Sequence, residues 1–106
     1  MIIAIIKLDA LPAKYLELKQ SLLAMIAPTI KEKGCLSHNI FRNIENENEF
    51  SLIQMWQSRE KWDDYLRSDI FTVLIGTRYL LSRPSEFKVH EVAHLSKWED
   101  AAAIRG

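Results

Sequence analysis

The sequence predicts an α+β fold of the ferredoxin-like type, with the element order βαββαβ and an antiparallel sheet. Four stretches have the apolar pattern of β-strands, and two others repeat apolar residues at the spacing of helices. The polar run NIENENE joins the second and third strands as a hairpin turn. In this arrangement two helices cover one face of the sheet and leave the other face bare.

The first strand, in MIIAIIKL, is apolar on both of its faces. Ile2 and Ile6 alternate with Ile3 and Ile5, which is typical of a strand that is covered above and below. A single small domain supplies only one covering layer, so the second apolar face requires another, most simply the same sheet of a second copy. We therefore expect a homodimer.

The first helix begins after Pro12, which a first helical turn tolerates. Its apolar stripe consists of Leu11, Tyr15, Leu18, Leu22 and Ile26. Pro28 lacks an amide donor and clashes with the preceding turn, so we expect a kink or a restart near it. Gly34 marks the end of this helical region.

The second strand is expected over residues 35–43, and the third runs from Phe50 to Trp56. At Ser58, a good N-cap, the period changes to that of a helix, which begins near Arg59. The third strand is therefore followed by the second helix with almost no linker.

The second helix places Trp62, Tyr65 and Leu66 on one face. It pauses near Ser68, where Asp69 can cap a further turn or two before the chain reaches Pro84. The fourth strand is expected over residues 86–95. We expect one domain over residues 1–95 and a tail over 96–106, which either holds a short helix (WEDAAAIR) that packs through Trp98 or frays.

Composition excludes several classes of partner. The 106 residues include 14 basic and 14 acidic ones without blocks, so we expect neither a nucleic acid nor a membrane as partner. MIIAIIKL is too short for a membrane span and lacks the positive start of a signal peptide. Cys35 is the only cysteine, which excludes an internal disulfide and a thiolate metal cluster. A reducing, cytoplasmic location is expected.

Several side chains are candidates for a site. Trp56 and Trp62 either sandwich a planar ligand or belong to the core. His38 is either a base whose pKa lies near the working pH or a strand histidine that faces solvent or the dimer interface. Gln54 can fix a ligand by hydrogen bonds but cannot take a proton. Lys7 either binds an acidic or enolate oxygen or is a charge at a strand end.

The other histidines do not form a metal site. His90 and His94 share a strand face but lie about 13 Å apart along an extended strand, too far to bind one ion without a bulge. Cys35 has no neighbouring base in the sequence and is interpreted as a packing residue. We expect no metal.

Two stretches carry a resemblance to a known family. APTIKEKGCLSHNIFRN, followed by the polar hairpin and by FSLIQMWQSREKWDDYLRSDIF, resembles the antibiotic biosynthesis monooxygenase (ABM) domain family of dimeric α/β barrels. The match covers Ile2 to His94. It implies a homodimer whose two sheets face each other, and a monooxygenase that acts without metal, flavin or haem on a small planar phenol or quinol.

The resemblance also assigns roles to residues. Tyr65 stands at a family pocket position. It is either a catalytic residue, whose hydroxyl bonds a phenolic or quinone oxygen and which shares this role with His38, or a helix residue whose ring lies in the core and whose hydroxyl meets water. The substrate-binding side chains implied are Lys7, Gln54, Trp56 and Trp62.

The sequence departs from the family at several of its functional positions. Many members have histidine at Tyr65 and Ile70 and glutamate at Gln54. The haem-degrading branch has its iron ligand at Ile75, and isoleucine cannot ligate iron. These departures favour the alternative function, a non-catalytic ligand-binding or stress-response dimer of the same fold.

Overall fold

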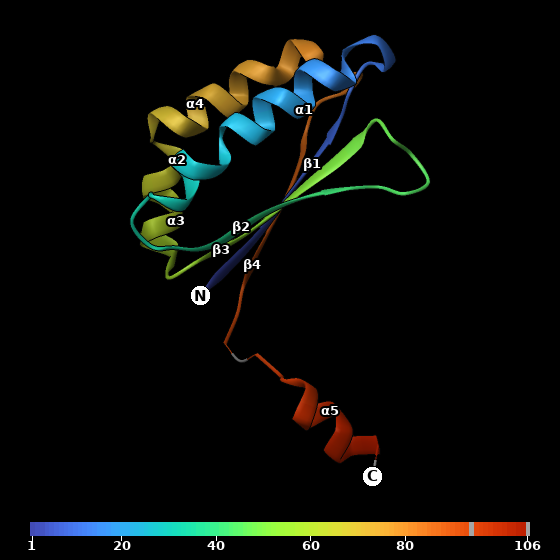
Figure 1. Ribbon diagram of the computed structural model, residues 1–106. Coiled ribbons are helices and arrows are strands. Elements are labelled where there is room, and N and C mark those ends of the chain that lie inside the picture. The colour runs from blue at the N-terminus through green and yellow to red at the C-terminus, as the bar shows by residue number, and fades with distance from the viewer. Residues whose placement is uncertain (94, 106) are drawn as a thin grey trace.

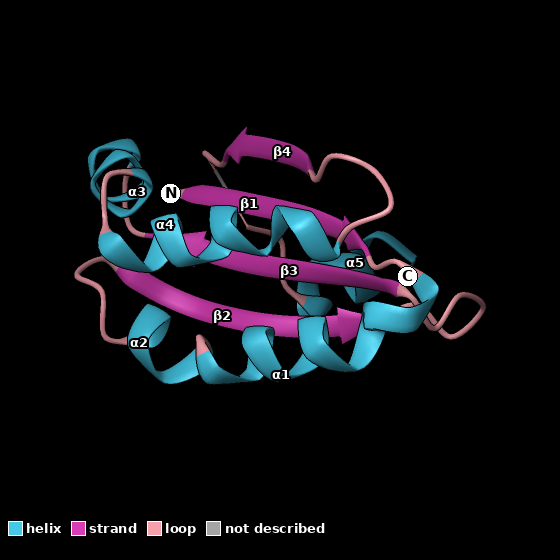
Figure 2. Cartoon of the chain, turned by 90° about the horizontal axis from the view of Figure 1, so that it is seen from above, coloured by secondary structure: helices cyan, strands magenta, loops and turns pink. Residues whose placement is uncertain are grey.

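The computed structural model describes residues 1–93 and 95–105. Four strands, β1 (Ile2–Asp9), β2 (Cys35–Arg42), β3 (Glu49–Trp56) and β4 (Glu86–Glu91), form one sheet in the order β2-β3-β1-β4 (Figure 2). All three pairings are antiparallel. The expected antiparallel sheet is therefore confirmed, and β4 ends at Glu91, earlier than the pattern suggested.

Helices cover one face of this sheet and leave the other bare (Figure 1). The covering layer comprises η1 (Pro12–Lys14), α1 (Tyr15–Ala24), α2 (Ile26–Ile30), α3 (Arg59–Leu66), α4 (Asp69–Ile75) and η2 (Gly76–Leu80). Two helical regions, each in several pieces, thus connect the strands in the predicted βαββαβ order. The fold is α+β and ferredoxin-like.

The strand register decides which side chains meet the helices. On the covered face, Ala4 pairs with Gln54 and Ile6 with Leu52, and all four side chains are buried. The remaining buried apolar residues of the covered face and its helices are Ile2, Leu8, Ala10, Leu18, Leu22, Met25, Phe50, Trp56, Trp62, Tyr65, Leu74 and Leu80. The core therefore lies between the sheet and the helices.

The open face carries the residues that alternate with this set. Its centre consists of the half-buried Ile3, Ile5, Ile53 and Met55, which pair across β1 and β3. Aliphatic side chains thus occupy both faces of β1, as the sequence predicted.

The first helical region breaks at Met25, between α1 and α2. Pro28 has no N–H to donate to the carbonyl of Ala24, and its ring crowds that same carbonyl four residues earlier. The Met25 N–H accordingly turns to Leu22 O, 3.1 Å away, and α2 restarts at Ile26. The break that we expected near Pro28 therefore falls three residues before it, and Pro28 itself lies inside α2.

Serine hydroxyls begin both helices of the second helical region. Ser58 Oγ accepts from the Lys61 N–H at 3.2 Å, which confirms the predicted cap of α3. Ser68 Oγ accepts from the Phe71 N–H at 3.3 Å, so the cap of α4 is Ser68, and Asp69 is the first residue of the helix.

Gly34 links α2 to β2 in a conformation that suits glycine, with φ at +83°. An added Cβ would lie only 2.4 Å from the Cγ of Lys61 on α3. This turn leads into β2, whose pairing with β3 shifts register between Cys35 and Ser37.

The tail forms the predicted helix, α5 (Trp98–Arg105), but not the predicted packing. It lies apart from the sheet and the helical layer (Figure 1), and Trp98 is 84% exposed. His94, one of the two histidines considered for a metal, lies outside the described residues. No helix in the described ranges is long and apolar enough to cross a membrane.

Candidate functional site

Three aromatic rings pack against one another where β3 meets α3. Trp56 and Tyr65 stack with centroids 4.6 Å apart, and Trp62 tilts against both at 6.2 and 5.7 Å. Phe71 of α4 meets the Tyr65 ring edge-on at 5.4 Å. The short turn at Ser58 folds α3 back over the end of β3, which brings these rings together. They fill the space between α3 and the sheet, and each of the three is at most 2% exposed.

A chain of hydrogen bonds connects this cluster to β2. Trp56 Nε1 donates to Gln54 Oε1 at 3.1 Å. The Gln54 amide nitrogen lies 3.2 Å from the Tyr65 hydroxyl and 3.1 Å from His38 Nδ1. Gln54 and His38 are opposite each other in the β2–β3 register, which places both side chains on the covered face. Four predicted site residues therefore form one buried network.

Burial shifts the titration of two members of this network. Burial lowers the pKa of His38 below 6.5, so its imidazole is neutral at neutral pH. Burial also raises the pKa of Tyr65, and the hydrogen bond from Gln54 opposes that shift. The Tyr65 phenol therefore stays protonated.

His38 also lines an apolar groove of about 510 Å³. We define the His38 groove by its walls, which are Leu22, Leu23 and Ile26 on the helical side and His38, Ile40 and Phe50 on the sheet side. Lys19 of α1 and Arg42 of β2 also border it. His38 is 7% exposed, and its Nε2 is the one buried side-chain nitrogen or oxygen that lacks a partner among the described residues.

Sequence reasoning found only part of the helical wall of this groove, because the predicted stripe included Leu22 and Ile26 but neither Leu23 nor Ile30. Leu23, Ile26 and Ile30 recur at helical spacing beside the core stripe of Leu18 and Leu22. This second stripe extends the apolar surface of the helix beyond what the core uses, and it is the signal that could have located the groove.

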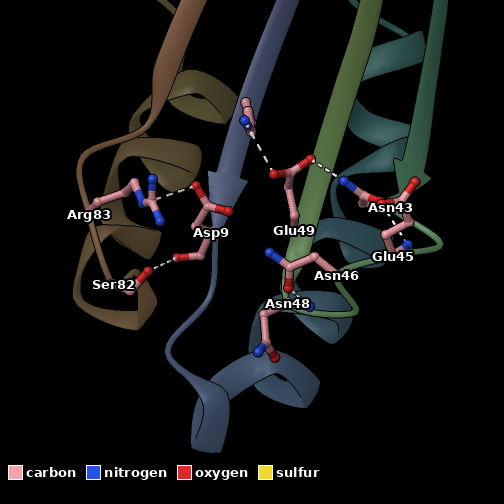
Figure 3. A network of polar contacts seen from close by, with 9 residues as sticks. Asp9, Asn43, Glu45, Asn46, Asn48, Glu49, Ser82 and Arg83 are labelled. Atoms are coloured by element: carbon pink, nitrogen blue, oxygen red, sulfur yellow. Dashed lines mark hydrogen bonds and ion pairs between the residues drawn. The ribbon is translucent and has the colours of Figure 1, made fainter.

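Lys7 does not join the other candidates, because its side chain lies on the open face. Lys7 Nζ contacts Glu49 Oε1 at 3.2 Å, and Glu49 Oε2 accepts from Asn43 at 2.9 Å (Figure 3). The hydrogen bond from Lys7 to Glu49, together with the charge of that carboxylate, raises the pKa of Lys7. At the same end of the sheet, Arg83 pairs with the Asp9 carboxylate at 3.3 Å (Figure 3).

A second, smaller cavity of about 210 Å³ lies between the sheet and the α4–η2 region. Its walls include Ile6 and Leu8 of β1, Phe87 of β4 and Leu74 and Ile75 of α4. Ile75, at the position of the haem ligand in one branch of the resembled family, contributes only a hydrocarbon surface there. In the described part of the chain no three metal-ligating side chains gather in one place.

Comparison with known proteins gives a consistent result. Residues 1–75 match the family model described as antibiotic biosynthesis monooxygenase. The uncharacterized protein sll1783 of Synechocystis is 26% identical over 69 residues, which are 64% of this chain and 47% of that protein. The chain thus spans about half the length of this relative.

Solved structures share the fold over most of the chain. Rv0793 from Mycobacterium tuberculosis is 26% identical, with a TM-score of 0.80 and coverage of 92% of this chain and 97% of that one. A conserved protein from Methanosarcina mazei is 23% identical, with a TM-score of 0.80 and coverage of 85% and 90%. A structure from Deinococcus radiodurans is 17% identical, with a TM-score of 0.84 and coverage of 92% and 97%.

Proposed function

Because the chain belongs to the antibiotic biosynthesis monooxygenase family, we propose that it is a monooxygenase that acts without metal, flavin or haem on a small planar phenol or quinol. The observation that carries this proposal is the buried chain of polar groups that ends at the His38 groove. Trp56, Gln54 and His38 are held in sequence by hydrogen bonds of 3.1 Å. Apolar walls beside one oriented polar group are typical of a site for a planar organic molecule.

In such a reaction the substrate supplies all the electrons. A phenol loses its O–H proton, the phenolate transfers an electron to dioxygen, and a C–O bond forms at a ring carbon that bears hydrogen. The O–O bond then breaks as that carbon loses its proton. One oxygen atom remains as a quinone carbonyl and the other leaves as water, so phenol and dioxygen give quinone and water. The protein's part is to exclude water, stabilise the anion and orient the ring.

The His38 groove supplies these conditions from residues of three elements. Leu22, Leu23 and Ile26 form a wall that keeps water from a bound ring. His38 is the catalytic residue that we assign to the substrate oxygen. Gln54 holds the imidazole of His38 and is itself held by the Tyr65 hydroxyl, so we assign Gln54 and Tyr65 positioning roles.

We also propose that the working unit is a homodimer that buries the open face. Ile3, Ile5, Ile53 and Met55 form an aliphatic surface on that face, with the Lys7–Glu49 pair at its edge. A second sheet over this surface would shield the four aliphatic side chains from water. It would also support the covered face, and with it the His38 groove, from below.

The second candidate function is a non-catalytic module that binds a small ligand in the same groove. The observation that favours it is the packing of Tyr65. This residue stands at a family pocket position, yet its ring is enclosed by Trp56, Trp62 and Phe71. In this packing Tyr65 contacts protein on all sides and reaches a ligand only through Gln54 and His38.

Oxygen consumption tests the first function against the second. A panel of phenols and quinols is incubated with the protein under ¹⁸O₂, and products are analysed by mass spectrometry. We expect one labelled oxygen atom in the product of at least one compound, together with loss of turnover in His38→Leu. Tyr79→Leu, at a 71% exposed position of η2, is the control and should keep full turnover. Binding in thermal-shift assays without oxygen uptake would establish the non-catalytic function instead.

A further inference from the structure

We infer that the His38 groove selects ligands that present an anionic or carbonyl oxygen, which accepts a hydrogen bond from His38 Nε2–H. We also infer that Gln54 and Trp56 are the positioning residues that fix His38 as a donor. The inference rests on the proposed function for the planar class of ligand. It goes beyond that function because it names the ligand group and the direction of the hydrogen bond.

The first step concerns the orientation of Gln54. An indole N–H can only donate a hydrogen bond. The Gln54 atom that lies 3.1 Å from Trp56 Nε1 must therefore be its acceptor, Oε1. The amide NH₂ then faces the opposite way, toward the Tyr65 hydroxyl and His38 Nδ1. Trp56 thereby decides which end of the amide meets the histidine.

The second step concerns the histidine tautomer. The amide NH₂ has two hydrogens, and its two neighbours at 3.1 and 3.2 Å each take one. His38 Nδ1 therefore accepts a hydrogen bond and carries no proton. A neutral imidazole has its single proton on the other nitrogen, so Nε2 of His38 is an N–H donor.

The third step concerns the free-energy penalty of leaving this N–H donor without an acceptor. Nε2 is enclosed and has no partner among the described residues. A buried, unpaired N–H destabilises a fold, and such groups in native proteins call for an explanation. Because the ring of His38 lines the groove, a ligand oxygen at this wall would remove the cost.

The charges around the groove favour the same class of ligand. Lys19 approaches from α1 and Arg42 from β2, and both are cations. Arg42 also contacts Glu47 at 3.5 Å and lies 4.7 Å from the centre of the Tyr15 ring, which holds it near the groove. The other titratable group of the network, Tyr65, lies behind Gln54 and is neutral. An oxyanion on an apolar ring fits these surroundings better than an ammonium group.

The consequence for catalysis is that His38 stabilises a phenolate and does not remove its proton. Its free Nε2 is already protonated, and its other nitrogen is occupied by the Gln54 amide. The phenol proton is therefore lost to solvent. The groove shifts the ionisation of the bound phenol toward the anion, as an oxyanion hole does.

Two measurements on the full chain test this inference. The first is ¹⁵N NMR of the imidazole rings, with the His38 signals assigned by comparison with His38→Leu. The second is titration with 4-nitrophenol, whose absorption reports its ionisation, and with 4-nitrotoluene as a ligand of similar shape that lacks the hydroxyl. Tyr79→Leu serves as the control for both.

We expect the neutral Nε2–H tautomer of His38, alone and with ligand, and bound nitrophenol that ionises at a lower pH than free nitrophenol. His38→Leu should weaken nitrophenolate binding about tenfold or more and change nitrotoluene binding much less. Gln54→Glu offers Nδ1 an acceptor in place of a donor, so the spectrum should change to the Nδ1–H or doubly protonated ring. Trp56→Phe should give a mixture of tautomers, because it frees the amide to turn.

An Nδ1–H tautomer in the unaltered protein would overturn the inference, whatever the variants do. Equal losses of nitrophenolate and nitrotoluene binding in His38→Leu, or no nitrophenolate binding at all, would also overturn it. Nitrophenolate binding with the expected tautomer but without oxygen uptake by any phenol would leave this inference standing and remove only the proposed monooxygenase function.

Discussion

The two faces of the sheet use the same four strands in different ways. On the covered face, large aromatic rings and a series of hydrogen-bonded side chains fill the space beneath α3. Helices of the same polypeptide cover this face. On the open face, Ile3, Ile5, Ile53 and Met55 remain half-buried beside the Lys7–Glu49 ion pair. The covered face is thus complete within one chain, whereas the open face has an apolar centre that one chain leaves uncovered. If the proposed homodimer forms, the exposure of Ile3, Ile5, Ile53 and Met55 in one copy overstates their contact with water in the working protein.

The largest expected effect is a charge at the centre of the open face. Ile5→Glu should abolish the proposed homodimer, because an unpaired charge buried in an interface costs about 3–5 kcal/mol. Sedimentation or light scattering at micromolar concentration measures the mass. Leu16→Glu, on the exposed side of α1, is the control and should stay dimeric. A dimeric Ile5→Glu protein with an unchanged melting temperature would show that the open face is not the interface.

Truncation of a core side chain on the covered face should lower the stability of the protein by nearly as much. Leu52→Ala removes a buried side chain of β3 and should lower the free energy of unfolding by about 2–5 kcal/mol. Leu36→Ala, at a half-exposed position of β2, should lower it by less than about 1 kcal/mol. Urea unfolding of both variants gives the comparison. Similar losses would mean that β2 is covered by a partner in the same way as β3 is covered by the helices.

The cap of α3 should contribute less than the core does. Ser58→Ala removes the acceptor for the Lys61 N–H and should cost about 1 kcal/mol. Ser51→Ala, on the open face of β3, has no cap to lose and serves as the control. Chemical unfolding measures both. Equal values for the two serines would contradict the assigned cap.

Acid should weaken the covered face through His38. The pKa of His38 is lowered in the fold by burial, so below pH 6.5 the unfolded chain takes up a proton that the folded chain resists. The free energy of unfolding should therefore fall as the pH drops through and below 6.5, and this contribution should level off below the folded pKa. Unfolding curves of the parent and His38→Leu at several pH values isolate the contribution of His38 to the pH dependence of the free energy of unfolding. A parent and variant with parallel pH profiles would contradict it.

The smallest expected effect is removal of the tail. A chain that ends at Leu95 lacks α5, whose Trp98 is 84% exposed, and should unfold at nearly the same denaturant concentration as the full chain. This truncation also tests the expected domain boundary after residue 95. A loss of more than about 1 kcal/mol would show that α5 packs on a second copy.

Most of the fold could be predicted from the sequence because its hydrophobic periodicity was clear. Alternation in the third strand and the switch to helical spacing at Ser58 placed β3 and α3 correctly. The break was expected near Pro28 and falls at Met25, three residues before it, because proline acts on the carbonyl four residues earlier. The end of β4 and the cap by Ser68 depend on pairing and on competition between neighbouring side chains, which a linear pattern does not record.

The site could be predicted only in part. His38, Gln54, Trp56 and Tyr65 were all candidates, and the register of β2 against β3 brought them together. Their partners within the network depend on side-chain torsions and on which end of an amide faces an indole, and neither follows from spacing. Lys7 was grouped with these four residues, but it directly follows Ile6 in β1. Its side chain therefore lies on the opposite face of the sheet.

The break between α1 and α2 divides the helical wall of the groove between two helices. Leu22 and Leu23 line the groove from α1, where Leu22 also belongs to the core, whereas Ile26 and the exposed Ile30 line it from α2. We expect substitutions at these two isoleucines to change the width and shape of the groove with little penalty in folding. Relatives of this fold can therefore acquire new ligand preferences through a few residues of one short helix, without a compensating change in the sheet.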